Sequence, residues 1–501
     1  MRGPMNTSTL ATPRQGSGRT ARLSRADSGS STTADGTLRI VRDPLRVLLF
    51  VLTILTVSRV HQHYPQLMHL RPALLLVVAA TVYAYLNPRY LTRSNVLALW
   101  PMRLVAVLGV LACCSAVFGI SLGRTASFIL DTYIKVLAYA FLLAVSIRHV
   151  RDLFTFVWAY VISCGILAFF SLFVFGISRT GNSDFARLSN LYMYDANDIG
   201  VIMMVGLPLT LLLLVSIRGG RSGRRLLLLI LLGISASIAR SGSRGGFLGF
   251  IAVSAAGLIL VNSVSVTRRI GMMAAVVVAL VFGASPGYWK QMGTVLQPES
   301  DYNYSTLYGR KALAERGIGY MAQYPVFGLG MDNFSRAECT ISRQLDTLSR
   351  SGPIRCRPPH NSYVEAGAEL GVPGLLVWVS LVVGIIVTLV RLRGRLPRSW
   401  RRGTEAERFM YGATSFFPLA MIGFAVTAFF VSFAWLDPLY ILAAFTTGLY
   451  VSLREQTQQR TGVGTGTLPP VRRSERVTPG WRVAQSAQRF VLSRSFPRPQ
   501  L

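Results

Sequence analysis

The chain has 501 residues, 51% of them hydrophobic, and a formal net charge of +31 at pH 7. Its apolar residues fall into runs of about 17–25, the length that a helix needs to cross a bilayer core of about 30 Å. This pattern excludes a soluble protein. The charge does not indicate nucleic-acid binding, because many of the basic residues, nearly all arginine, lie in short loops between apolar runs and in the two ends of the chain. The positive-inside preference of membrane proteins places them there.

Both ends of the chain are polar. Residues 1–43 are rich in Ser, Thr, Gly and Arg, and residues 454–501 are again polar and Arg-rich. This composition predicts two disordered tails, which their charge would hold in the cytoplasm. No apolar run of about 7–15 residues follows the early arginines, so we do not expect a signal peptide.

Twelve transmembrane helices are expected between the tails, nine within 44–285 and three within 362–453. Their ranges are 45–60, 72–87, 103–122, 126–146, 153–176, 199–217, 226–240, 245–262, 270–285, 364–390, 410–433 and 436–453. Arginines concentrate in alternate loops, so we expect both termini in the cytoplasm. The polar residues 286–361 then form one large extracytoplasmic loop.

Two ionisable residues, Asp131 and Lys135, fall in the middle of the predicted helix 126–146. Residues at this spacing lie on one helix face, where they can form an ion pair. Charges at such depth are costly and also indicate function. A structural ion pair and a functional role therefore both remain open.

The first outer segment, 178–198, contains Arg187, with Leu191 following after three residues. An arginine on an outer loop runs against the positive-inside preference, which favours a functional role for Arg187. Asn197 and Asp198 open the next helix and are natural N-caps. For Asp198, capping alone and a place in a functional site both remain open.

A second outer motif is the tight turn at residues 240–246, with the sequence RSGSRGG. Its glycines let the backbone approach a ligand closely, and Arg240 and Arg244 offer forked donors that suit phosphate. The alternative is a short hairpin whose arginines reach lipid headgroups.

In the large loop, Arg310 precedes a short amphipathic segment, 310–324, and a Pro-x-x-Gly-x-Gly turn that begins at Pro325. A functional arginine and an ordinary solvated one both remain open. Cys339 and Cys356 are the only cysteines outside apolar runs. Since the outer compartment is oxidising, we expect a disulfide between them, with two free thiols as the alternative.

The large loop ends at His360-Asn361, directly before the predicted helix 364–390. Histidine is the side chain whose unperturbed pKa lies near neutrality. A His-Asn pair just outside a membrane helix therefore suits acid–base chemistry on a substrate that arrives at the membrane surface. The alternative is a helix cap with an exposed histidine.

The sequence His360-Asn361, nine residues, Gly371, two residues, Gly374 resembles the signature of the O-antigen ligase family. That family also includes polysaccharide polymerases and protein O-oligosaccharyltransferases. The other motifs resemble it in the same order, so that the likeness covers most of residues 178–375. Many ligases continue with Thr-Thr, whereas Leu375 and Leu376 follow here, which weakens the case for a ligase relative to a polymerase.

The resemblance implies an all-α, GT-C-like membrane glycosyltransferase in the bacterial inner membrane. Such an enzyme moves a glycan from an undecaprenyl-diphosphate donor to a hydroxyl of a glycan or of lipid A-core on the outer face. By resemblance, His360 would be the catalytic base, Arg187, Arg310 and Arg244 would bind the diphosphate, and Asn361, Asp198 and Arg240 would support them. If arginines carry the charge of the leaving group, no metal or other cofactor is needed.

A transporter is the competing class of function. It would also show many helices and buried charges such as Asp131 and Lys135. It would not need a long outer segment that ends in a His-Asn motif, and it would form no glycosidic bond. Within the enzyme class, ligase and polymerase differ only in the acceptor, and the sequence does not choose between them.

Overall fold

The structure is a computed structural model. It describes residues 38, 40, 41, 43–88, 90, 96–179, 186–189, 191, 192, 194–217, 220–261, 265–284, 287–297, 308–342 and 355–461. The two predicted tails therefore lie mostly outside the described residues. The backbone N–H of Leu38 donates to Glu405 Oε2 at 2.9 Å, so the predicted N-terminal tail is anchored near its end. At the other end, the last helix continues to Thr461, beyond the predicted boundary at 453.

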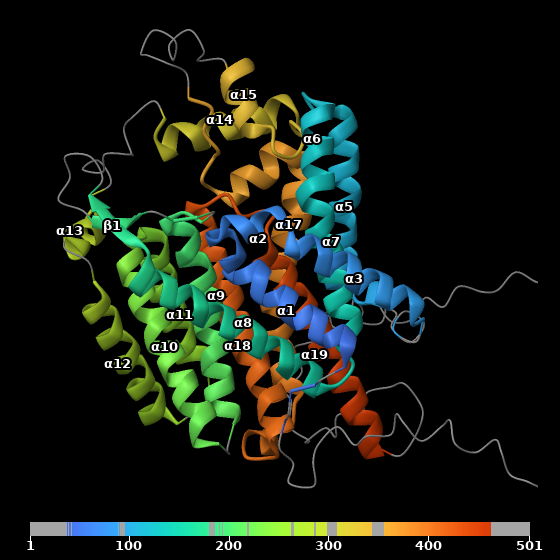
Figure 1. Cartoon of the computed structure of the whole chain (residues 1–501), viewed down its shortest axis with the longest axis vertical. Coiled ribbons are helices and arrows are strands. Elements are labelled where there is room, and N and C mark those ends of the chain that lie inside the picture. The colour runs from blue at the N-terminus through green and yellow to red at the C-terminus, as the bar shows by residue number, and fades with distance from the viewer. Residues whose placement is uncertain are drawn as a thin grey trace, which may run out of the picture. The chain divides into compact units, whose positions relative to one another are not determined.

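Helices account for nearly all of the described structure (Figure 1). Nine stretches in the described ranges are long and apolar enough to cross a membrane: Pro65–Leu86, Trp100–Phe118, Leu122–Ser146, Val150–Val174, Ala196–Ser216, Arg221–Ser241, Val266–Gly283, Ser362–Arg395 and Glu405–Phe430. Pro44–Ser58 and Arg244–Leu260 are shorter apolar helices. The all-α, polytopic character is thus confirmed. Every one of the twelve predicted ranges overlaps a helix, but the count of twelve spans stays a prediction.

Helix α9 (Ala196–Ser216) lies at the centre of the bundle. It packs against α8 (Val150–Phe169), α10 (Arg221–Ser241), α11 (Arg244–Leu260) and α18 (Glu405–Thr427) (Figure 1). A helix surrounded in this way is apolar on every side, and its rare hydroxyls bond within the helix, as Thr210 does to the Gly206 carbonyl at 2.8 Å. The start of α9 is consequently a rigid platform for whatever precedes it.

The described part of the large loop includes the short helices α13 (Tyr288–Gly293), α14 (Arg310–Gln323) and α15 (Phe334–Thr340). The predicted amphipathic segment 310–324 is α14. Its apolar face forms a small core with α15 and the start of α17 (Ser362–Arg395), built from Leu313, Tyr320, Leu329, Phe334, Ala337, Val364 and Ala368. The loop is therefore a folded cap over one end of the bundle rather than a loose connection.

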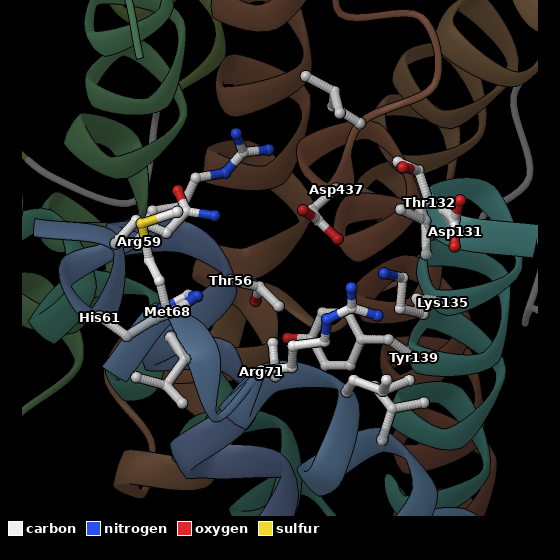
Figure 2. A pocket seen from close by; sticks show the side chains of 17 residues that line it. Thr56, Arg59, His61, Met68, Arg71, Asp131, Thr132, Lys135, Tyr139 and Asp437 are labelled. Carbon is white, nitrogen blue, oxygen red and sulfur yellow. The ribbon is translucent and has the colours of Figure 1, made fainter. Parts of the chain in front are cut away.

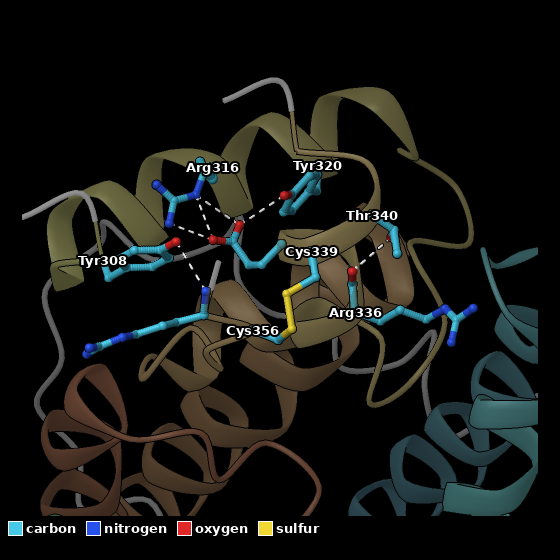
Figure 3. Close-up of a disulfide and its surroundings, with 9 residues drawn as sticks. Tyr308, Arg316, Tyr320, Arg336, Cys339, Thr340 and Cys356 are labelled. Atoms are coloured by element: carbon cyan, nitrogen blue, oxygen red, sulfur yellow. Dashed lines mark hydrogen bonds and ion pairs between the residues drawn. A yellow bond between two sulfur atoms is a disulfide. The ribbon is translucent and has the colours of Figure 1, made fainter. Parts of the chain in front are cut away.

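Two covalent and polar links hold this cap together (Figure 3). Cys339 and Cys356 form a disulfide with a Cα–Cα distance of 5.4 Å, so the pair expected from the sequence is joined in the structure. Beside it, the guanidinium of Arg316 pairs with the buried Glu338 carboxylate, with Nε donating at 2.8 and 2.9 Å. Tyr320 Oη also donates to Glu338, at 2.9 Å. A buried charge of this kind needs these partners.

Helix α17 is kinked, and the Pro-x-x-Gly-x-Gly turn at 325–330 fills the kink. Gly371 has φ 71° and ψ −175°, a conformation essentially confined to glycine. Pro373 has no N–H to donate to the Glu369 carbonyl, and the N–H of Gly330 donates to it instead at 3.0 Å. Two further backbone bonds seal the junction, from Leu329 to Ala368 at 2.8 Å and from Val372 to Pro325 at 2.8 Å.

Two predicted helices differ from the structure. The predicted helix 410–433 ends as an α-helix at Thr427, followed by the 3₁₀ turn η7 (Ala428–Phe430) and extended backbone before α19 (Asp437–Thr461). The apolar run from Phe429 to Trp435 gave no sign of this break. The predicted helix 126–146 extends from Leu122 to Ser146 and contains a π-helical turn, η3 (Ile129–Tyr133).

Candidate active site

The irregular segment 428–437 organises one end of the bundle. The hydroxyl of Ser362 donates to the Val431 carbonyl at 2.8 Å and accepts from the Phe433 N–H at 2.9 Å. The Glu365 carboxylate accepts from the Ala434 N–H at 2.9 Å. Two side chains in the first turn of α17 thus bind the backbone of this segment at Val431, Phe433 and Ala434.

His360 lies directly before α17, and its backbone is fixed on both sides. Its N–H donates to Ser432 Oγ at 3.0 Å. On the other side, Asn361 Oδ1 accepts from the N–H groups of Tyr363 and Val364 at 2.9 and 3.2 Å, so Asn361 is the N-cap of α17. His360 is half-buried and has φ 49°, in the left-handed region that few residues other than glycine adopt.

The protonation of His360 is governed by burial and by nearby arginines. Burial lowers the pKa of His360 most, and the positive charge of Arg310 lowers it next. Asp195 raises this pKa, whereas Arg357 and Arg187 lower it further. The imidazole is therefore neutral at pH 7, the form that accepts a proton. Arg187 and Arg310, distant in sequence, act on the same side chain.

Arg187 is held by the start of α9. It lies on β2 (Ala186–Ser189), which pairs with β1 (Gly176–Arg179) so that Arg187 is opposite Ser178. One guanidinium nitrogen, Nη2, donates to Asn197 Oδ1 at 3.2 Å. The same oxygen accepts from Ser243 Oγ at 3.0 Å. Asn197 thereby ties the Arg187 hairpin to the turn that precedes α11.

Asp198 has a capping role, and the prediction of the N-cap itself was off by two or three residues. The N-cap of α9 is Asp195, whose carboxylate accepts from the N–H groups of Asn197 and Asp198. Asp198 Oδ2 in turn accepts from the Asp195 N–H at 2.9 Å. This reciprocal pair is a capping box, so the hydrogen bonds of Asp198 are those of a helix cap. Asn197, freed from capping, holds Arg187.

Arg310 and the turn that contains Arg244 both pack against Phe430. Ser243 caps α11, and Arg244 Nη1 donates to Thr294 Oγ1 in the large loop at 3.1 Å. A Cβ on Gly245 would lie 2.8 Å from the Phe430 Cβ, so the turn packs directly on this ring. The guanidinium of Arg310 lies over the same ring, 5.6 Å from its centroid.

Arg240 is placed differently from the other arginines. It lines an apolar cavity of about 1320 Å³ between α8, α10 and α12 (Val266–Gly283). No contact given for the described residues joins it to His360 or Arg187. Its supporting role at the catalytic site therefore stays a prediction, without a contact that argues for it.

Sequence reasoning missed several residues of the site. Ser432 and Phe430 were hidden inside an apolar run, although Asp437-Pro438 marks the start of a new helix. The buried carboxylate of Glu369 accepts from Trp435 Nε1 at 2.7 Å and from the Phe334 N–H at 3.2 Å. A carboxylate within a membrane helix is a signal in itself, and it could have drawn attention to Glu369.

Among the described residues, no group of three or more His, Cys, Asp or Glu side chains is arranged to hold a metal ion. The candidate site is instead a neutral imidazole with guanidinium groups around it. Such a site can take a proton from a hydroxyl and can stabilise negative charge on a phosphate oxygen.

Comparison with known proteins gives one match. Residues 226–379 match the family model described as O-antigen ligase, and no curated protein matches the chain. The matched region includes Arg240, Arg244, Arg310 and His360, whereas Arg187 lies before it. The match to residues 226–379 supports an O-antigen ligase-related membrane family for this multi-pass protein.

Proposed function

We propose that the protein transfers a glycan from an undecaprenyl-diphosphate donor to an acceptor hydroxyl at the outer face of the bacterial inner membrane. The observation that carries this proposal is that Arg310 lies over Phe430, two residues before Ser432, which binds the backbone of His360. The charges of Arg310 and Arg187 also lower the pKa of His360. The O-antigen ligase domain supports the same class of chemistry.

In the proposed reaction, an imidazole nitrogen of His360 takes the proton of the acceptor hydroxyl. The hydroxyl oxygen forms a bond to the anomeric carbon of the donor sugar, and the bond from that carbon to the phosphate oxygen breaks. Its electron pair leaves with the diphosphate. Arg187 and Arg310 stabilise the growing negative charge, and Arg244, next to the glycine that packs on Phe430, binds the second phosphate.

Replacement of His360 tests the proposal most directly. His360→Ala in a deletion strain should abolish transfer while protein level and membrane insertion stay normal, because the side chain is only half-buried. His69→Ala is the matched control, since His69 is exposed in the short helix α2 (Pro65–His69). Normal polymer attachment in the His360→Ala strain would contradict the proposal.

The deletion strain also identifies the acceptor. A ligase attaches polymer to lipid A-core, so its loss leaves free polymer intact. A polymerase extends a lipid-linked glycan, so its loss leaves single repeat units. Loss of substrate movement across the membrane, with transfer intact in isolated membranes, would instead indicate a transporter.

A further inference from the structure

A cavity of about 550 Å³ is lined by five charged residues (Figure 2). They are Arg59 after α1 (Pro44–Ser58), Arg71 before α3 (Pro72–Leu86), Asp131 in η3, Lys135 in α7 (Ile134–Ser146) and Asp437 at the start of α19. The volume lies within the range of about 300–1,000 Å³ that is usual for small-molecule sites.

A chain of contacts links the wall of the cavity to the backbone of His360. The guanidinium of Arg59 lies over the Tyr194 ring, 4.6 Å from its centroid. Tyr194 stacks on Phe433 with centroids 6.5 Å apart. Phe433 follows Ser432, which holds His360, and Asp437 closes the same segment on the cavity side. The cavity therefore lies at the end of the bundle where the hydroxyl acceptor has to arrive.

The charges in this cavity do not neutralise one another in contact. Within the described ranges, no ion pair of 4.0 Å or less joins any two of its five charged residues. The ion pair between Asp131 and Lys135 that the spacing allowed is absent there, and Asp131 instead accepts from Ser127 Oγ at 3.1 Å. Charged side chains that line a cavity without pairing with one another are more typical of a ligand site than of a structural ion-pair network.

Two buried polar atoms on the cavity wall also lack partners in the described structure, namely His61 Nδ1 and Gln62 Oε1. Buried polar groups almost always form hydrogen bonds, so each exception needs an explanation. Burial lowers the pKa of His61, and Arg59 lowers it further. A neutral His61 and the Gln62 amide both suit hydroxyl groups of a ligand.

The balance of charges selects the kind of ligand. Three cationic residues face two carboxylates, which leaves a net positive charge for an anionic group. A phospholipid headgroup with only acceptor oxygens would bring no hydrogen-bond donor to Asp131 and Asp437. A sugar with a carboxylate meets both needs, because its hydroxyls donate to the carboxylates while its own carboxylate binds the cations.

We propose that this cavity binds an acidic sugar of the acceptor glycan and so presents a neighbouring hydroxyl to His360. This inference rests on the proposed transfer function and names the acceptor class for it. Lys135 and Arg59 hold the sugar carboxylate, and Asp437 binds its hydroxyls.

Binding of glucuronate to purified full-length protein, followed by saturation-transfer NMR, tests the cavity without any turnover. We expect a glucuronate signal that glucose does not give at equal concentration. The signal should fall at least several-fold in Lys135→Met and recover in part in Lys135→Arg. It should stay unchanged in Lys290→Met, since Lys290 is an exposed lysine of α13 outside the cavity.

Several outcomes would overturn the inference: no glucuronate signal, an equal signal from glucose, or an unchanged signal in Lys135→Met. Binding of phosphatidylglycerol vesicles that is lost in Lys135→Met, together with the absence of any glucuronate signal, would assign the cavity to a lipid headgroup. The His360→Ala variant separates the two proposals. If it still binds glucuronate but wild-type protein performs no transfer, the cavity stands and the proposed reaction falls.

Discussion

His360 combines an unusual backbone conformation with an unusual electrostatic setting. Its N–H is used by Ser432, its successor caps α17, and its ring is half-buried beside guanidinium groups. Burial and positive neighbours both disfavour the imidazolium. The residue is thus poised to accept a proton rather than to donate one at neutral pH.

This setting predicts the pH dependence of transfer. Because the pKa of His360 is lowered in the folded protein, activity should be full at neutral pH and should fall as pH drops through that lowered pKa. Arg310→Gln removes the largest charge effect and should move the acid limb to higher pH. Rate–pH profiles of the two proteins measure the shift. Arg336→Gln, at an exposed position (Figure 3), should leave the limb in place.

Arg187 should act through its forked guanidinium rather than through charge alone. Arg187→Ala should lower the turnover rate by about 10²-fold, the usual effect of losing one donor to a developing anion. Arg187→Lys should recover only part of the loss, because an ammonium cannot bind Asn197 and a phosphate in one plane. Full recovery with lysine would show that only charge is needed there.

The short motifs predicted where chemistry is located better than they predicted which atoms connect it. The sequence predicts Arg187, Arg310 and His360 on outer segments, and in the structure the charges of both arginines lower the pKa of His360. It did not predict that Asn197 binds Arg187, because Asp195, Asn197 and Asp198 are all good N-caps. Which of them caps depends on the angle at which the chain enters α9, and that angle is a tertiary property.

In α17, the kink at Gly371 and Pro373 packs against the glycine- and proline-containing turn at 325–330, so two sequence motifs form one contact. Gly371 sits where a Cβ would lie 2.6 Å from the Val326 carbonyl oxygen. The turn at 325–330 enters this gap and replaces the helical bonds that Pro373 cannot make. Irregular backbone at membrane depth is tolerated where protein covers it. The sequence supplied both motifs, but not their contact, because 40 or so residues separate them.

Gly371→Ala should therefore destabilise the protein by about 1–3 kcal/mol through backbone strain, with the clash against the turn in addition. Thermal unfolding of purified protein and protease cleavage of the large loop both measure the effect. Gly394→Ala in the same helix is the control, since nothing lies within 4 Å of a Cβ there. It should stabilise the helix by about 0.4–1 kcal/mol. If both variants had the same thermal stability, the contact between Gly371 and the turn at 325–330 would not stabilise the protein.

At the scale of the whole molecule, apolar run length predicted the helical class and the order of the helices. It failed at 428–437 because length and hydropathy report burial, not backbone geometry. Phe433 and Trp435 of this segment are buried, and with Phe429 and Phe430 they form an apolar run that has the composition of a membrane helix. The packing of α17, α18 and α19 is needed to see that this segment lines the candidate active site beside His360.

The distribution of arginines predicts on which side of the membrane each end of the helix bundle lies. Arginines at the His360 end have partners in the folded structure, as Arg124 does with Asp332 at 2.9 Å and Arg187 with Asn197. Those of the opposite end, between α17 and α18, are mainly exposed and follow the positive-inside preference. We expect reporter fusions after Thr404 to be cytoplasmic and fusions after Asn303 to be extracytoplasmic. The same compartment for both would mean that the number of spans between them is even, which contradicts a single crossing by α17. A cytoplasmic Asn303 fusion would in addition place His360 on the side that an outer-face acceptor cannot reach.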